Sequence, residues 1–210
     1  MAYFPLYIDL KKRRCLVIGG GQVAWRKIQT LLQFEAEIVV ISAAVVPEIQ
    51  QLHDLRKLTY WKKSYQNGDL SGFFLVIAAT SDPALNDAVY DDAVRMNVWV
   101  NSADDPEKCT FVFPAVVKND ALVVGVTSSG RFPALTRLLR EKIASFAIFQ
   151  RETALETWAE FRRKIQTEVA DPDKRRQLLR AAGRAILDDP AGDPRMVLEK
   201  IDGEKRDAEA

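Results

Sequence analysis

Short apolar runs alternate with helical repeats over the first hundred residues of the chain. The runs are nearly continuous in apolar residues, which is typical of parallel strands covered on both faces. They lie at 14–18, 37–41, 73–78 and 98–101. Between them, apolar residues recur at the spacing of one helix face, in the segments 23–32, 47–58 and 82–97. Strands and helices that alternate in this order predict an α/β fold with a Rossmann-type doubly wound parallel sheet.

The pattern changes after the fourth of these strands. Two β-rich runs, 111–117 and 121–127, are joined by residues 118–120, and this arrangement predicts a β-hairpin. From there on, apolar residues recur at helical spacing over 133–188, and a further short helix is expected around 196–201. The second half of the chain is therefore expected to be one hairpin followed by helices.

Composition and charge exclude several classes of protein. The chain of 210 residues has 30 Lys and Arg against 29 Asp and Glu, whereas a generic nucleic-acid binder has a large basic excess. No apolar run reaches the roughly 18 residues of a membrane span, and the first residues lack the apolar core of a secretory signal. We expect a cytoplasmic protein with no nucleic-acid or membrane partner.

Charge is unevenly distributed along the chain. Residues 131–184 contain 13 Lys and Arg against 7 Asp and Glu. This excess is typical either of solvated helix faces or of a surface for an anionic ligand. The chain has one histidine, His53, which we expect at the surface, and two isolated cysteines. Neither a disulfide framework, a Ser-His-Asp triad nor a metal site is therefore predicted.

A glycine-rich segment links the first strand to the first helix. It matches the pattern G-x-G-x-x-A, in which the glycines allow a tight turn and the approach of a pyrophosphate, and the alanine allows close packing of helix on strand. This context predicts a dinucleotide-binding loop; the alternative is a purely structural turn. The predicted cofactor-binding residues of the loop are Gly19, Gly21, Gln22, Val23 and Ala24.

The end of the second strand decides which nucleotide is expected. The acidic residue that usually binds the ribose is missing there, and the segment has Ser42, Ala43 and Ala44 instead. Ser42 offers a hydroxyl to the ribose, and no nearby Arg or Lys favours a 2′-phosphate. The sequence therefore predicts NAD rather than NADP, with these three residues among its contacts.

Two later segments carry further candidate chemistry. The segment 101–106 follows a strand, where open α/β sheets place their ligands, and a carboxylate there is suited to act as a general base. The alternative is an ordinary turn. The segment 127–133 combines hydroxyls with Arg131 before a helix, which suits either a carboxylate cradle or simple helix capping.

Taken together, these segments resemble the precorrin-2 dehydrogenases, the family that includes the N-terminal part of sirohaem synthases. The matching pieces are FPLYIDLKKRRCLVIGGGQVAWRK, FFLVIAATSD, VNSADDPEKCTFVFPAVV and VTSSGRFPALTRLLREKI, in this order over about residues 4–143. Because no methyltransferase module follows, a stand-alone form is expected. Thr80, in the second piece, joins the predicted cofactor contacts.

The resemblance implies oxidation of precorrin-2 to sirohydrochlorin with NAD⁺ as hydride acceptor, by a homodimer. It places the catalytic aspartate at Asp104. The predicted substrate-binding residues are Asn101, Ser128, Arg131 and Arg137, since precorrin-2 is a polycarboxylate that arginines can pair with. Some relatives also insert Fe²⁺ into sirohydrochlorin.

The pattern and the resemblance divide the chain into three parts. These are an NAD-binding Rossmann-like domain at 1–113, a β-hairpin/helix dimerisation region at 114–145 and a helical C-terminal domain at 146–210. A different class of function also fits the glycine loop, namely an NAD(H)-sensing regulatory module without catalysis. Reduction of NAD⁺ in the presence of precorrin-2 distinguishes the two.

Overall fold

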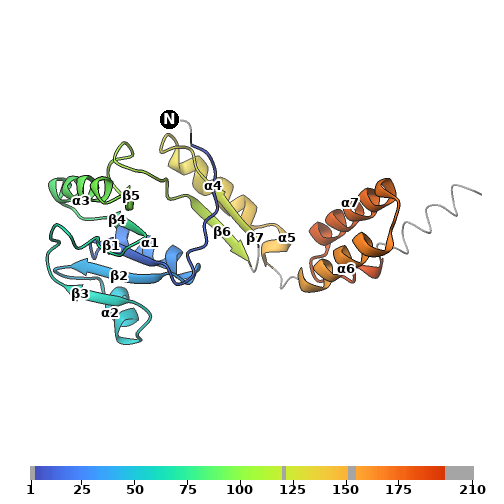
Figure 1. Ribbon diagram of the computed structural model, residues 1–210, viewed down its shortest axis with the longest axis horizontal. Coiled ribbons are helices and arrows are strands. Elements are labelled where there is room, and N and C mark those ends of the chain that lie inside the picture. The colour runs from blue at the N-terminus through green and yellow to red at the C-terminus, as the bar shows by residue number, and fades with distance from the viewer. Residues whose placement is uncertain (1–2, 120–121, 151–154, 197–210) are drawn as a thin grey trace, which may run out of the picture. The chain divides into compact units, whose positions relative to one another are not determined.

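The structure is a computed structural model that describes residues 3–119, 122–150 and 155–196 (Figure 1). It contains two compact units. The first takes the residues up to Pro114 together with Thr127–Phe132, and the second takes Ala115–Val126 and the residues from Pro133 on. Within the described part of the chain, none of the helices is both long and apolar enough to cross a membrane.

The first unit is built on a parallel sheet of five strands. The strands are β1 (Arg14–Ile18), β2 (Glu37–Ser42), β3 (Thr59–Lys62), β4 (Leu75–Ala78) and β5 (Trp99–Ser102). Their order in the sheet is β3-β2-β1-β4-β5, and each neighbouring pair is parallel. The predicted Rossmann-type α/β fold is therefore confirmed.

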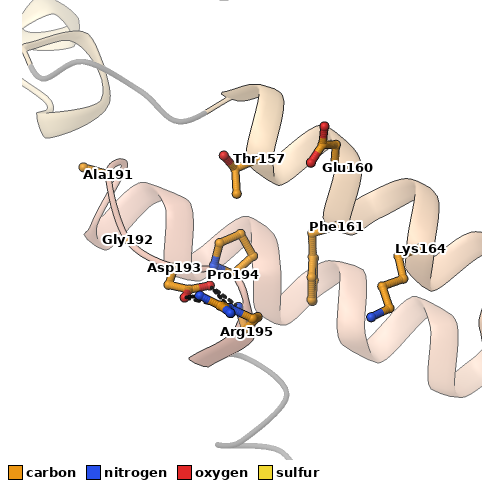
Figure 2. A pocket seen from close by; sticks show the side chains of 9 residues that line it. All are labelled: Thr157, Glu160, Phe161, Lys164, Ala191, Gly192, Asp193, Pro194 and Arg195. Carbon is orange, nitrogen blue, oxygen red and sulfur yellow. Dashed lines mark hydrogen bonds and ion pairs between the residues drawn. The ribbon is translucent and has the colours of Figure 1, made fainter.

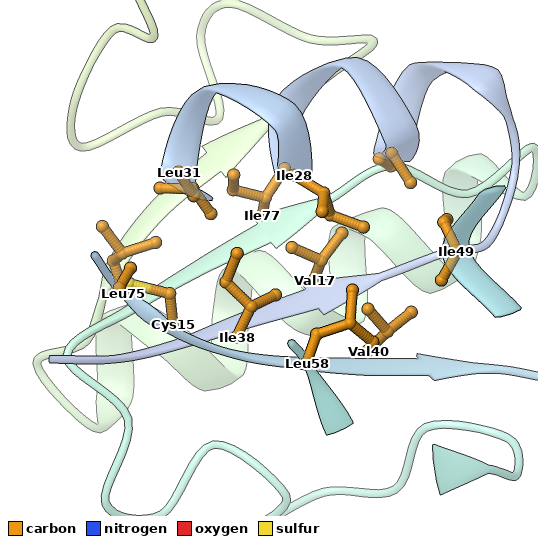
Figure 3. Packing of buried hydrophobic residues seen from close by; sticks show 13 residues of the cluster. Cys15, Val17, Ile28, Leu31, Ile38, Val40, Ile49, Leu58, Leu75 and Ile77 are labelled. Carbon is orange, nitrogen blue, oxygen red and sulfur yellow. The ribbon is translucent and has the colours of Figure 1, made fainter. Parts of the chain in front are cut away.

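Alternate residues of the strands face two separate hydrophobic clusters. Val17 of β1 packs in one cluster with Ile28 of the helix α1 (Gln22–Leu32), together with Ile49 of α2 (Pro47–Asp54) (Figure 3). Leu16, the neighbour of Val17, packs in the other cluster with Val89 of α3 (Pro83–Arg95). The sheet is thus covered by helices on both faces, as its continuous apolar strands require.

The α2 segment differs from its prediction. A helix was expected to residue 58, but α2 ends at Asp54. Arg56 has a φ of +57°, and the next amide, that of Lys57, donates to the carbonyl of Leu52 over 2.9 Å. This is the hydrogen-bond pattern of a Schellman C-cap. The chain is then free to form β3, which was not predicted.

Local signals set the beginning of α3 and the end of α2. The Asp82 carboxylate accepts hydrogen bonds from the amides of Ala84 and Leu85, so that it caps the N-terminus of α3. His53 is half-buried, and its Nδ1 accepts a hydrogen bond of 3.3 Å from the amide of Tyr60. The single histidine thus holds the first residues of β3 against α2.

The second unit begins with a two-stranded antiparallel sheet. Its strands are β6 (Ala115–Asn119) and β7 (Leu122–Val126), and the connection at 120–121 lies outside the described residues. The first predicted hairpin strand began at Phe111, which is too early. Phe111 instead packs on Trp99 of the first unit, with their ring centroids 6.2 Å apart.

Helices make up the rest of the second unit. They are α4 (Pro133–Ala144), α5 (Ala147–Gln150), α6 (Leu155–Glu168) and α7 (Pro172–Asp188). The apolar stripe predicted on α6 is buried against α7, where Trp158, Phe161 and Ile165 cluster with Leu178 and Ala182. The short helix expected around 196–201 lies outside the described residues, apart from its first residue.

An open hollow of about 440 Å³ lies beside α6 (Figure 2). Phe161 and Lys164 line it from the helix, and the segment 191–195 lines it from the other side. There Arg195 forms an ion pair with Asp193. None of the residues predicted to bind cofactor or substrate lines this hollow.

Candidate active site

Three loops meet at the carboxyl edge of the sheet. The amide of Ala79, after β4, donates to the carbonyl of Ile18 in β1 over 2.8 Å. The amide of Ala103, after β5, donates to the carbonyl of Ala78 in β4 over 2.9 Å. The loops after β1, β4 and β5 are therefore neighbours. The strand order reverses between β1 and β4, which is where doubly wound sheets bind their ligands.

Three consecutive glycines follow β1, and each position is glycine for a different physical reason. A Cβ on Gly19, whose φ is +119°, would lie 2.2 Å from the carbonyl oxygen of Ala79. A Cβ on Gly20 would lie 2.1 Å from the carbonyl oxygen of Ala44. Gly21 has a φ of −86°, and nothing in the described chain lies within 4 Å of the position its Cβ would take. The fold requires the first two glycines, whereas a bare Gly21 leaves open space in front of α1.

The N-terminus of α1 is suited to an anion. Gly21 is its N-cap residue, and in the described chain no side-chain hydrogen bond caps it and no acidic side chain lies in the first turn. The positive end of the helix is thus not neutralised by the protein, as in pyrophosphate-binding loops. Gln22 and Val23 are exposed, while Ala24 is buried against the sheet. The residues present therefore fit a dinucleotide at this loop.

The end of β2 offers a hydroxyl and a nearby cation. The Ser42 hydroxyl donates to the carbonyl of Ala44 over 2.7 Å, so its lone pairs remain as acceptors for a ribose hydroxyl. Ala43 and Ala44 are exposed. The expectation that no basic residue lies near is wrong, because β3 places Lys62 opposite Ser42 in the sheet. The sequence missed Lys62 because it missed β3.

Asp104 is held by two hydrogen bonds just beyond β5. The Ser102 hydroxyl donates to its Oδ1 over 2.5 Å, and the Asn86 amide donates to its Oδ2 over 2.9 Å. Burial raises the pKa of the Asp104 carboxyl, but these hydrogen bonds and the charge of Lys108 lower it by more, so the net shift is downward. Asp104 is exposed and therefore presents an oriented, ionised carboxylate to solvent.

Asn86 is a residue of this site that sequence reasoning missed. It lies in the first turn of α3, and its Oδ1 accepts a hydrogen bond of 2.8 Å from the hydroxyl of Thr80. The same side chain bonds Asp104, so the predicted cofactor residue and the predicted catalytic residue share one partner. The signal in the sequence is a polar residue on the buried face of α3, which also carries Val89, Asp92 and Ala93.

Asn101 lies inside the protein rather than at its surface. It is buried, and its Nδ2 donates to the carbonyl of Phe111 over 3.2 Å. Its Oδ1 accepts from Lys27, whose ammonium lies 4.2 Å from the ring centroid of Phe113. Burial lowers the pKa of Lys27 to about 8. In this arrangement the Asn101 amide supports the loop that carries Asp104.

The segment 127–132 packs beside the Asp104 loop. The Cβ position of Gly130 lies 3.7 Å from the ring of Pro106. The Ser128 hydroxyl accepts a hydrogen bond of 3.0 Å from the amide of Phe132. This is the helix-capping contact that the sequence offered as the alternative to a carboxylate cradle. Arg131 is exposed. The structure therefore brings Ser128 and Arg131 into the same unit as Asp104.

Arg137 belongs to α4 in the second unit. Its Nε donates to the carboxylate of Glu141 over 3.0 Å, and both side chains are exposed enough to reach solvent. Arg137 is thus a solvated, ion-paired residue of a helix, and its contact with a substrate stays a prediction.

Comparison with known proteins agrees with this geometry. A family described as "Putative NAD(P)-binding" matches residues 6–115, just over half of the chain. Siroheme synthase 1 of Pectobacterium atrosepticum is 40% identical over 177 residues, which are 84% of this chain and 37% of that protein. Siroheme synthase 1 of Cronobacter sakazakii is 45% identical over 145 residues, 69% of this chain and 31% of that protein. The chain thus spans under two fifths of the length of these relatives.

A solved structure covers nearly the whole chain. It is named "SirC, precorrin-2 dehydrogenase", is 26% identical and has a TM-score of 0.69, with 96% of this chain and 100% of that chain covered. The resemblance predicted from the sequence is confirmed. The chain belongs to this NAD(P)-binding family, in the group that contains the precorrin-2 dehydrogenases and the sirohaem synthases.

Proposed function

We propose that the chain is an NAD-dependent precorrin-2 dehydrogenase, which oxidises precorrin-2 to sirohydrochlorin. The observation that carries this proposal is the meeting of a nucleotide loop and an oriented carboxylate at one edge of the sheet. The loop after β1 is separated from Asp104 only by the loop after β4. The similarity to a structure named as precorrin-2 dehydrogenase supports the same reaction.

The glycine loop and the end of β2 are the proposed nucleotide contacts. The first turn of α1, behind the open Gly21, holds the pyrophosphate, and Ser42 accepts a hydrogen bond from the ribose. Thr80, at the end of the adjacent β4, lies on the path from this loop to Asp104. When bound, NAD⁺ supplies an acceptor for the hydride that the substrate loses.

Asp104 takes the proton that leaves the substrate. Oxidation removes two hydrogens, one as a hydride with the electron pair of its C–H bond and one as a proton. A carboxylate that is ionised and held in a fixed direction is suited to accept that proton. The lowered pKa means that Asp104 stays in its accepting form at neutral pH.

Substrate carboxylates need cations and hydroxyls beside Asp104. Arg131 supplies a cation and Ser128 supplies a hydroxyl, both from the segment that packs on Pro106. For Arg137 of α4, taken by itself, the proposal is that it exchanges its partner Glu141 for a substrate carboxylate. The basic excess of residues 131–184 supports the attraction of a polycarboxylate.

The active form is proposed to be a homodimer. The face of α4 that carries Leu135, Leu138 and Leu139 is apolar and exposed, and Leu138 is 63% exposed. Single exposed leucines are ordinary, but a contiguous apolar face on one helix is typical of an interface. This face lies in the region 114–145, between the proposed domains 1–113 and 146–210. The occupant is a second copy of the same helix.

The proposal is tested by mixing the purified chain with NAD⁺ and precorrin-2 and recording NADH formation. We expect NADH to appear in step with loss of precorrin-2. Binding of NAD⁺ by calorimetry with no NADH formed would refute the dehydrogenase and leave the NAD(H)-sensing module, which no observation in the structure favours otherwise.

A further inference from the structure

The side chain of Asn86 joins two loops of the site through four hydrogen bonds. Its Oδ1 accepts from the amide and the hydroxyl of Thr80, over 3.2 and 2.8 Å. Its Nδ2 donates to the carbonyl of Thr80 over 3.2 Å and to Oδ2 of Asp104 over 2.9 Å. Asn86 is 1% exposed and comes from α3, while Thr80 follows β4 and Asp104 follows β5.

Only a primary amide of this size can make these contacts. The acceptor oxygen serves the two donors of Thr80, and the NH₂ group serves a carbonyl and a carboxylate. An aspartate has no donor for Asp104, and an aliphatic residue removes the partner that Asn86 supplies to the amide and the carbonyl of Thr80. The two ends of the amide therefore match the chemistry of the two loops.

The bond to Asp104 gives the second N–H of the buried Asn86 amide its partner, and it also acts on the carboxylate. Buried polar groups require partners, and the contacts with Thr80 are explained in that way. Asp104 is exposed, so water would satisfy its oxygen equally well. What the Asn86 bond adds is a fixed direction for the carboxylate, together with the Ser102 bond on the other oxygen.

We propose that Asn86 is a positioning residue that fixes the carboxylate of Asp104 relative to the nucleotide-binding loop at Thr80. The inference rests on the proposed dehydrogenase, in which Asp104 accepts a proton and Thr80 lies beside NAD⁺. It explains how a base on one loop keeps a constant place relative to a cofactor on another. A shift of either loop would otherwise change the geometry of proton and hydride loss.

The charged groups around Asp104 set the direction of the expected pH effect. Lys108 lowers the pKa of Asp104, and Lys108 is itself paired with Asp87 and lies 3.9 Å from Asp105. Loss of Asn86 removes a hydrogen bond that favours the ionised form, so the pKa of Asp104 must rise. The acid limb of the kcat/KM profile then moves to higher pH, since more of the enzyme is protonated at a given pH.

The test uses two variants and a control on the same helix. Asn86→Ala removes all four bonds, and Asn86→Asp keeps the size of the side chain but faces Asp104 with a second carboxylate. Val89→Ala creates a buried cavity on α3, since Val89 is fully buried. Val89 packs in a hydrophobic cluster that contains neither Thr80 nor Asp104. The Val89→Ala variant therefore measures what loss of stability alone does.

We expect both Asn86 variants to lose roughly 10- to 10²-fold in kcat, the scale of a misplaced catalytic group. Their acid limbs should lie at higher pH than in the parent, whereas Val89→Ala should keep the parent's profile. A second readout needs no activity: the carboxyl carbon of Asp104 is titrated by NMR, and its midpoint should rise in both variants.

Unchanged titration of Asp104 in the Asn86 variants would overturn the inference. The inference would also be overturned if Val89→Ala showed the same loss of kcat and the same shift of the acid limb as the Asn86 variants. If Asn86→Ala does not fold, Asn86→Asp gives the same comparison. A parent protein that forms no NADH would refute the proposed function, while the NMR titration would still decide whether Asn86 controls Asp104.

Discussion

Replacing Gly21 by aspartate separates the fold of the glycine loop from its binding of a nucleotide. The backbone there is extended, with a φ of −86°, and nothing in the described chain lies within 4 Å of the new Cβ. Aspartate is also a better N-cap than glycine, by about a few tenths of a kcal/mol. The thermal unfolding temperature should therefore stay the same or rise slightly.

The effect on NAD⁺ should be large. The new carboxylate enters the space in front of α1 where the pyrophosphate is proposed to lie, and it competes for the same backbone amides. Two like charges about 4 Å apart repel by about 4 kcal/mol at an effective dielectric constant of about 20. This corresponds to roughly a 10³-fold rise in Kd. In a calorimetric titration, Gly21→Asp should show essentially no NAD⁺ binding.

The neighbouring glycine gives the matched control. A Cβ on Gly20 would lie 2.1 Å from the carbonyl oxygen of Ala44, so Gly20→Ala forces the backbone apart. Overpacking of this kind costs typically about 1–3 kcal/mol of stability. The unfolding temperature should fall in Gly20→Ala and not in Gly21→Asp. Unchanged NAD⁺ affinity in Gly21→Asp would refute the assignment of this loop.

Three further predictions address the catalytic residue, the assembly and the choice of nucleotide. Asp104→Ala should lower the rate of single-turnover NADH formation by roughly 10²-fold or more, with little change in NAD⁺ affinity. Asp105→Ala should lower that rate much less. A larger loss of rate in Asp105→Ala would place the base one residue later. Light scattering at micromolar concentration should give a dimer mass, and Leu138→Glu should give a monomer; a monomeric parent would count against the interface. Calorimetry should show tighter binding of NAD⁺ than of NADP⁺, and Lys62→Ala, beside Ser42, should weaken only the NADP⁺ titration; equal losses for both would contradict this placement.

Elements with strong local signals were predictable from the sequence. The strands β1, β2 and β4 are continuous apolar runs, and α3 begins with its own capping aspartate and a proline. The strand β3 has no such signal, because its four residues are exposed or half-buried. It exists through pairing with β2 at the edge of the sheet, and no pattern within Thr59–Lys62 reports that pairing.

The site was predictable to the extent that it follows from chain order. A glycine loop after the first strand and an aspartate after a later strand must both lie at the carboxyl edge of a parallel sheet. The distinct reasons for the three glycines were not predictable. Gly19 and Gly20 are bare because of carbonyl groups at Ala79 and Ala44, and only the folded chain brings these groups against the loop.

The contrast between Asp104 and Asn86 shows where such reasoning from sequence stops. A strand end and a resemblance identify Asp104 as the group that reacts, but the direction and ionisation of its carboxylate depend on a residue of α3. Asn86 is visible in the sequence only as a polar residue at a helix position that should be apolar, and that position does not reveal its partners. The partners are Thr80, six residues before, and Asp104, eighteen residues after, on the far side of β5. Because one buried amide bonds both, the geometry of the base relative to the nucleotide loop is a property of the packed α3, and a change in that helix should alter catalysis even where both loops keep their sequences.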